Sequence, residues 1–150
     1  MRYLPLVLLL LILAGFAIPV TAADPNRMGY LSLDGVSIEL HDADARIVVE
    51  YTVDPGMHLI ILLLGTGDLQ RKLEKALNYP GLKAGEVGLN RSVFTVEDMA
   101  ESYGDRAYWF PAHDFGATFP RLTVEAPGYS LSYTNASSIP RGFGYFGGSP

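Results

Sequence analysis

Residues 36–53 read VSIELHDADARIVVEYTV, and this stretch decides the fold. Apolar side chains occupy every second position on either side of an acidic turn at residues 41–44. A period of two places one set of side chains on the buried face of a strand and the other set in solvent. The pattern therefore predicts an antiparallel hairpin across this turn.

A second alternating stretch covers residues 121–134 and has the turn dipeptide Pro127-Gly128 near its centre, so it predicts another hairpin. Between the hairpins, an apolar run extends from Met57 to Leu64, directly after the Pro-Gly turn signal at residues 55–56. A continuous apolar run of this length suits a strand that is covered on both faces, although periodicity alone does not separate it from a buried helix.

One helix is predicted, over residues 68–78. Apolar residues recur there at helical spacing on one face, namely Leu69, Leu73, Ala76 and Leu77. Several short strands, frequent turns and one helix predict a mainly β fold, either an antiparallel β-sandwich or a partly closed barrel with this amphipathic helix inserted. The alternative is an α+β domain in which the helix packs on an antiparallel sheet.

The first 23 residues differ in composition from the rest of the chain. Arg2 precedes an uncharged and almost wholly apolar stretch, residues 3–23, which ends in the small residues Ala22 and Ala23. These features are typical of a secretory signal peptide over residues 1–23. The alternative is a retained N-terminal anchor, because a membrane-spanning helix needs about 17–25 apolar residues. In both cases residues 24–150 are expected to form a single exported globular domain, secreted or on the extracellular face of the membrane.

Composition excludes several kinds of site. The chain of 150 residues has no cysteine, which excludes a disulfide scaffold, a thiol nucleophile and a cysteine-ligated metal. Residues 24–150 carry 10 basic and 16 acidic side chains, and this acidic balance argues against binding nucleic acid through phosphate neutralisation. No cofactor is expected, and no metal either, because the three histidines are widely spaced and form no H-x-x-x-H pair.

The densest group of aromatic and titratable side chains lies at residues 108–115, YWFPAHDF, which include the only Trp of the chain. Aromatic rings beside a carboxylate can stack on sugar rings or apolar ligands, and a histidine can titrate near neutral pH. The candidate ligand-binding residues are therefore Tyr108, Trp109, His113 and Asp114. The alternative is that Tyr108 and Phe110 fill the core while Trp109 packs on the other face.

Two features concern the surface of the exported domain. Asn90-Arg-Ser and Asn135-Ala-Ser are sequons, so Asn90 and Asn135 are candidate N-glycosylation sites. The chain ends in a tail rich in Gly and aromatic residues, residues 141–150, whose tip is expected to be loose. Such a tail could add a strand to the sheet edge of another chain.

These features predict an exported cell-surface or envelope domain that acts by binding a protein partner or by self-assembly, with no chemistry evident. One alternative is a small-ligand or glycan-binding module that uses the segment around Trp109. Another is a small secreted hydrolase whose site is scattered through the chain, although no G-x-S-x-G motif occurs. Membrane contact is expected only through residues 3–23, if they are not cleaved.

We expect the protein recovered from its native host to begin at Ala23 or Asp24 in the soluble fraction, because the small residues at the end of the leader suit a signal peptidase. Intact-mass measurement and N-terminal sequencing of the soluble and membrane fractions test this start. An intact N-terminus in the membrane fraction would identify the anchor instead. A full-length chain in the soluble fraction would contradict both forms.

Overall fold

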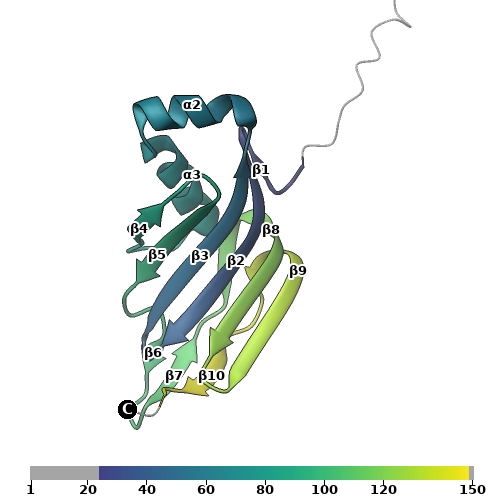
Figure 1. Ribbon diagram of the computed structural model, residues 1–150. Coiled ribbons are helices and arrows are strands. Elements are labelled where there is room, and N and C mark those ends of the chain that lie inside the picture. Colours follow the sequence, from purple (N-terminus) through teal and green to yellow (C-terminus); the bar gives the residue numbers. More distant parts are fainter. Residues whose placement is uncertain (1–23, 149–150) are drawn as a thin grey trace, which may run out of the picture.

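The computed structural model describes residues 24–148, so the predicted cleavage at Ala22 or Ala23 lies outside the described residues. The described chain is mainly β, with one large sheet, one small sheet and two helices (Figure 1). The large sheet has seven strands in the order β4-β5-β3-β2-β8-β9, with β1 paired to β2. It does not close into a barrel, because β4 and β9 remain separate edges.

The strands of the large sheet vary widely in length. Their bounds are β1 Arg27–Met28, β2 Leu31–His41, β3 Asp44–Val53, β4 Lys83–Val87, β5 Arg91–Val96, β8 His113–Ala126 and β9 Tyr129–Ile139. The longest strands lie side by side at one end of the strand order, where β2, β8 and β9 are neighbours.

The two predicted hairpins are both present. Strands β2 and β3 pair in antiparallel register from Leu31↔Val53 to His41↔Asp44. Strands β8 and β9 pair in antiparallel register up to Ala126↔Tyr129, across the predicted Pro-Gly turn. Short-range alternation and turn residues were sufficient to predict both hairpins, because the two strands of a hairpin are close together in the sequence.

The expectation of a purely antiparallel sheet is wrong. Strand β8 runs parallel to β2, with Val36↔Leu122 and Ser37↔Thr123 among the paired residues. A parallel pair needs a long crossover connection, and here the crossover contains both helices and five of the other strands. No local sequence pattern reports such a long-range pairing.

The apolar run after Pro55 forms helix α2, Pro55–Leu64, so the prediction of a strand from Met57 to Leu64 is wrong. Proline is favoured in the first turn of a helix, where no intrahelical partner exists for its missing N–H. Leucine is also a strong helix former. The apolar run suited either element, and in the described chain no strand lies beside it to make it part of a sheet.

The second helix, α3, spans Gly67–Leu77 and buries four residues, namely Leu69, Leu73, Ala76 and Leu77. These are the residues whose spacing predicted one helical face. The chain therefore has two helices in this region where one was expected. Helix α3 packs against β8, and the Tyr30 hydroxyl donates to the Asp68 carboxylate (2.8 Å) at its first turn.

The small sheet is antiparallel and has the order β10-β7-β6. Its strands are β6 Glu101–Ser102, β7 Ala107–Phe110 and β10 Phe143–Phe146. Four residues of the tail are therefore a strand of its own chain, and Tyr145 within it is buried. The end of the tip that is expected to be loose, residues 149–150, lies outside the described residues. Tyr145 lies in the core and Phe143 packs against it. The burial of these rings outweighs the conformational entropy that the neighbouring glycines lose.

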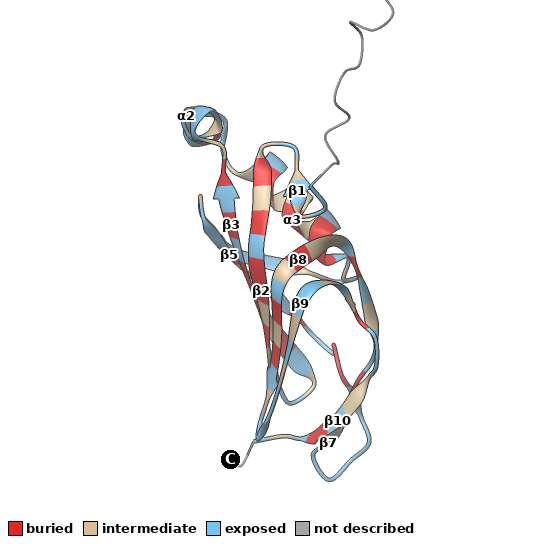
Figure 2. Ribbon diagram, turned by 90° about the vertical axis from the view of Figure 1, so that its right-hand side faces the viewer, coloured by how far each residue is buried: buried red, intermediate tan, exposed pale blue. Residues whose placement is uncertain are grey.

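The core lies between the large sheet and the layer formed by α3 and the small sheet, which cover the same side of it (Figure 2). Strands β2 and β3 line this core with alternate residues such as Ile38 and Ile47, both fully buried. Phe94 and Phe119 extend it across β5 and β8, while Phe110 closes it from the small sheet. The described chain thus builds one continuous core.

The close approach of β8 to α3 depends on Gly116. A Cβ atom at this position would overlap the carbonyl oxygen of Lys75 in α3. The contact is with backbone, which cannot move aside as the end of a flexible side chain can. The glycine thus allows β8 to pass directly beneath the helix.

We expect Gly116→Ala to lower the free energy of unfolding by about 1–3 kcal/mol, because overpacking forces backbone to shift. Urea denaturation measures the change. Gly67→Ala is the matched control, since a Cβ there meets nothing within 4 Å and the effect should stay within about 1 kcal/mol. Equal effects of the two variants would contradict the assigned helix–strand contact.

Candidate functional site

His113 opens β8, and its ring is enclosed by aromatic side chains. It stacks on Tyr79 with ring centroids 3.5 Å apart and meets Phe115 edge-on at 4.8 Å. Its Nε2 lies 2.9 Å from the carbonyl oxygen of Leu77. A carbonyl oxygen only accepts, so Nε2 carries the proton and donates it to the last turn of α3. The imidazole thereby fastens the end of the helix to the start of the strand.

Burial controls the electrostatics of this cluster. It lowers the pKa of His113, while the hydrogen bond to Leu77 and the charge of Asp114 oppose the shift. Burial raises the pKa of Tyr79 far above its ordinary value. The Tyr79 hydroxyl is buried and has no hydrogen-bond partner among residues 24–148. Both rings are therefore neutral at physiological pH, as a packing cluster requires.

Trp109 lies in β7 and faces away from the core. Its indole covers the backbone of β10 and of the residue before it, because an added Cβ would come within 2.8 Å of the ring at Gly142 and within 3.7 Å at Gly144. The side chain remains 42% exposed. Glycines opposite a tryptophan let the flat ring lie on the neighbouring strand without a clash. The ring is thus presented to solvent on a backbone platform.

The four candidate ligand-binding residues have different surroundings. Tyr108 stacks on Tyr145 in the small sheet, with ring centroids 5.6 Å apart. His113 belongs to the cluster at the end of α3, and Trp109 lies over β10. The Asp114 side chain is exposed, while its carbonyl oxygen accepts from Asn78 Nδ2 at 3.0 Å. A ligand site formed by all four residues stays a prediction.

The acidic turn at residues 41–44 holds the small sheet against the large one. The Asp42 carbonyl oxygen accepts a hydrogen bond from the Tyr145 hydroxyl, and Asp44 Oδ1 accepts one from the Asp98 backbone N–H at 3.0 Å. The Ala43 carbonyl oxygen accepts from the Ala100 N–H at 2.9 Å. Among residues 24–148, no group of three or more His, Asp or Glu side chains is placed to hold a metal ion.

Both sequons are accessible, but in different settings. Asn90 is exposed in the connection before β5. Asn135 is exposed within β9 and has a φ of 49°, so it interrupts the extended backbone of that strand. A glycan on Asn135 would stand at the edge of the large sheet.

Sequence reasoning missed two surfaces. Strand β9 forms an edge of the large sheet over 11 residues with no charged side chain, Gly or Pro. Helix α2 exposes most of its apolar side chains. The lack of any charge in residues 129–139 was a visible indication of the first surface, whereas the second required knowing that only Ile61 of α2 is buried in the core. Within the described part of the chain, no helix has the length and apolar character to cross a membrane.

Comparison of the chain with protein-family models, with curated proteins and with solved structures gives no match.

We expect the free energy of unfolding to decrease as the pH falls below about 6.5, the ordinary pKa of histidine, with part of the decrease due to His113. Its folded-state pKa is depressed, so the unfolded chain binds the proton more readily than the folded chain does. His113→Gln should remove this part of the pH dependence. Urea denaturation between about pH 7 and about pH 5 measures it.

The control for this measurement is Tyr79→Phe. This variant keeps the ring that stacks on His113 and removes a buried hydroxyl that has no partner. It should retain the wild-type pH dependence and lose no stability, because no hydrogen bond is broken. The same pH dependence in the wild type and in His113→Gln would refute the role assigned to the imidazole.

Proposed function

We propose that the protein is an exported cell-surface or envelope domain that acts by binding a protein partner or by self-assembly, and that the contact is strand addition at β9. The observation that carries this proposal is the unprotected edge of the large sheet. An edge strand presents unpaired N–H and C=O groups, which can pair with a strand of another chain. Directional backbone hydrogen bonds would give such a contact its register.

The regular part of β9 is long enough to receive a strand. Six consecutive residue pairs join it to β8, from Ala126↔Tyr129 to Arg121↔Thr134, and its other side has no strand beside it in the described chain. Proteins usually protect such edges with charged residues, proline or bulges. Residues 129–134 contain none of the charged residues or prolines.

Side chains along this edge would add specificity. Ser130, Ser132 and Thr134 are exposed on one face of β9, while Leu131 and Tyr133 are half-buried on the other. Hydroxyl rows can make cross-strand hydrogen bonds with a partner strand. The left-handed backbone at Asn135 marks the end of the regular stretch, so the proposed contact covers residues 129–134.

We also propose that the architecture is that of a β-sandwich. The small sheet lies on the same side of the large sheet as α3, and Phe110 and Tyr145 from it enter the shared core (Figure 2). Helix α3 fills the part of this second layer that the short strands do not reach. This arrangement leaves the β9 edge outside the core and open to another chain.

We expect Ser132→Lys to abolish association through β9, because a charged side chain at an edge disfavours pairing with a further strand. Sedimentation velocity of the chain beginning at Asp24 measures self-association over a range of concentrations. Ser37→Lys is the matched control. Ser37 and Ser132 both pair with Thr123, so they lie in one row across the sheet, but β2 is an interior strand.

If the protein is monomeric, a photo-crosslinking amino acid placed at position 132 in the native host tests for a different partner chain. Crosslinks to one defined protein from position 132, and none from position 37, support the proposal. A monomer that gives no crosslink at position 132, or association that Ser132→Lys leaves intact, would contradict it.

A further inference from the structure

Helix α2 exposes an apolar surface. Five of its large side chains are exposed, among them Leu62 at 70% and Leu63 at 74%, and the full set is Leu59, Ile60, Leu62, Leu63 and Leu64. Only Ile61 is buried, at 6%. The helix has no charged residue, and His58 is its one polar side chain. A contiguous apolar surface of this kind marks a contact with a protein or a membrane.

The geometry of the helix turns this surface away from the body. Successive residues of an α-helix are rotated by about 100°, so Leu59 and Leu63 each lie about 160° from Ile61. Ile60 and Leu62 lie about 100° from Ile61, on either flank. The side opposite the buried residue is therefore apolar across its whole width. Such a helix is typical of an apolar surrounding.

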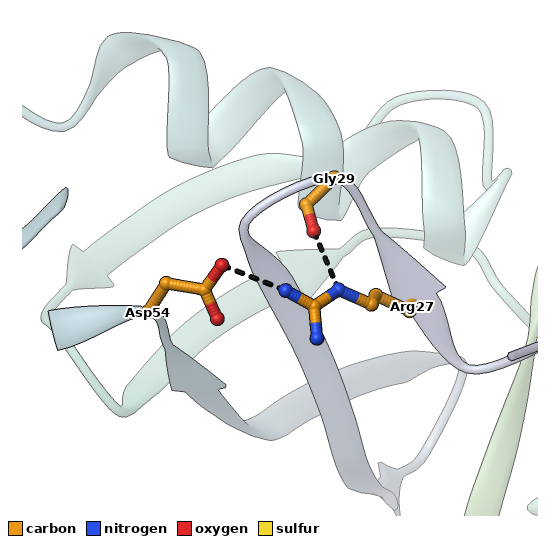
Figure 3. Close-up of polar contacts among 3 residues, drawn as sticks. All are labelled: Arg27, Gly29 and Asp54. Carbon is orange, nitrogen blue, oxygen red and sulfur yellow. Dashed lines mark hydrogen bonds and ion pairs between the residues drawn. The ribbon is translucent and has the colours of Figure 1, made fainter. Parts of the chain in front are cut away.

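The start of α2 is bonded to the start of the described chain. Arg27 Nη2 of β1 lies 2.7 Å from Asp54 Oδ2, the residue before the helix, and Arg27 Nε donates to the Gly29 carbonyl oxygen at 2.9 Å (Figure 3). The Asp54 N–H also donates to the Tyr30 carbonyl oxygen at 2.9 Å. These contacts connect α2 to the segment that directly follows residues 1–23.

Both elements lie at one end of the molecule. Helix α2 crosses the end of the large sheet where β1 and the first described residues are found, whereas the small sheet lies at the far end (Figure 1). The preceding residues 3–23 are uncharged and almost wholly apolar. This end of the domain therefore directly follows the segment that is expected to enter the membrane during export.

The size of the helix favours lipid over a second copy of the chain. Helix α2 offers ten residues, and five of them are large, apolar and exposed. A stable protein interface takes about 20–30 residues from each partner. A lipid surface has no such minimum, because binding strengthens steadily with the apolar area that enters it.

We propose that α2 docks into the surface of a lipid bilayer and holds this end of the exported domain against the membrane. The outward side chains Leu59 and Leu63 enter the boundary between headgroups and acyl chains. The domain then contacts the membrane through its folded part as well as through residues 3–23, in contrast to the expectation from sequence. The inference rests on the export in the proposed function and not on strand addition at β9.

Flotation with vesicles of equal parts phosphatidylcholine and phosphatidylglycerol tests the proposal with the chain beginning at Asp24. This chain contains every core residue that the structure describes, from Leu31 to Tyr145, so we expect it to fold without the leader. We expect it to float with the vesicles, also at high salt, because the contact is apolar. Leu59→Gln with Leu63→Gln should reduce the bound fraction by about tenfold per leucine.

The matched control is Phe146→Gln, which removes a side chain that is 71% exposed at the far end of the molecule. It should float as the wild type does. Ser132→Lys should also float, so that a failure at β9 and a failure at α2 are distinguishable. A wild-type protein that does not float, or a double variant that floats equally well, would overturn the proposal. A dimer that the double variant loses, without flotation, would assign α2 to a second copy instead.

A direct probe of the helix avoids any change in stability of the double variant. The chain has no cysteine, so Leu63→Cys gives one labelling position for an environment-sensitive fluorophore. Vesicles should shift its emission to the blue, as transfer from water into lipid requires, and Phe146→Cys should show no shift. Equal responses at the two positions would overturn the proposal.

Discussion

The described structure depends on the one-sided burial of the β2–β3 hairpin. Its register pairs Val36 with Val49 and Ile38 with Ile47, so their side chains enter the same core. A slip of one residue would turn the apolar set of one strand into solvent. The pairing of β2 with β3 shifts register between Leu33 and Gly35. Leu33 and Val36 are an odd number of residues apart, and this irregularity lets both side chains face the core. The remaining elements extend this apolar face or cover it.

The covering layer explains where the aromatic side chains of the second half lie. Phe110, Phe115 and Phe119 pack inward, and the His113–Tyr79 stack joins the end of α3 to β8. Of the residues singled out for ligand chemistry, Tyr108 and His113 therefore also serve packing, whereas Trp109 and the side chain of Asp114 are exposed. The two surfaces used in our proposals differ in physical character. The β9 edge offers directional backbone hydrogen bonds, whereas α2 offers apolar area without direction.

The limits of sequence reasoning are clearest at residues 55–64 and in the tail. An uncharged apolar run suits a buried strand or a helix, and the choice depends on whether a neighbouring strand is present to pair with it. For the tail, the glycine and aromatic content predicted a loose tip and a strand offered to another chain, whereas Phe143–Phe146 pair with β7 of the same chain. Among the candidate site residues, spacing along the chain could not show that Trp109 and His113 face different surroundings.

The sequence by itself determined the two hairpins and the buried face of α3, because alternation, helical spacing and turn residues act over short distances. It also defined the uncharged character of residues 3–23, a property of composition alone. Only the tertiary structure decided that β8 lies parallel to β2, that β9 is an edge and that α2 contributes only Ile61 to the buried core. Those outcomes depend on contacts between residues far apart in the chain, whose free energies no local pattern contains.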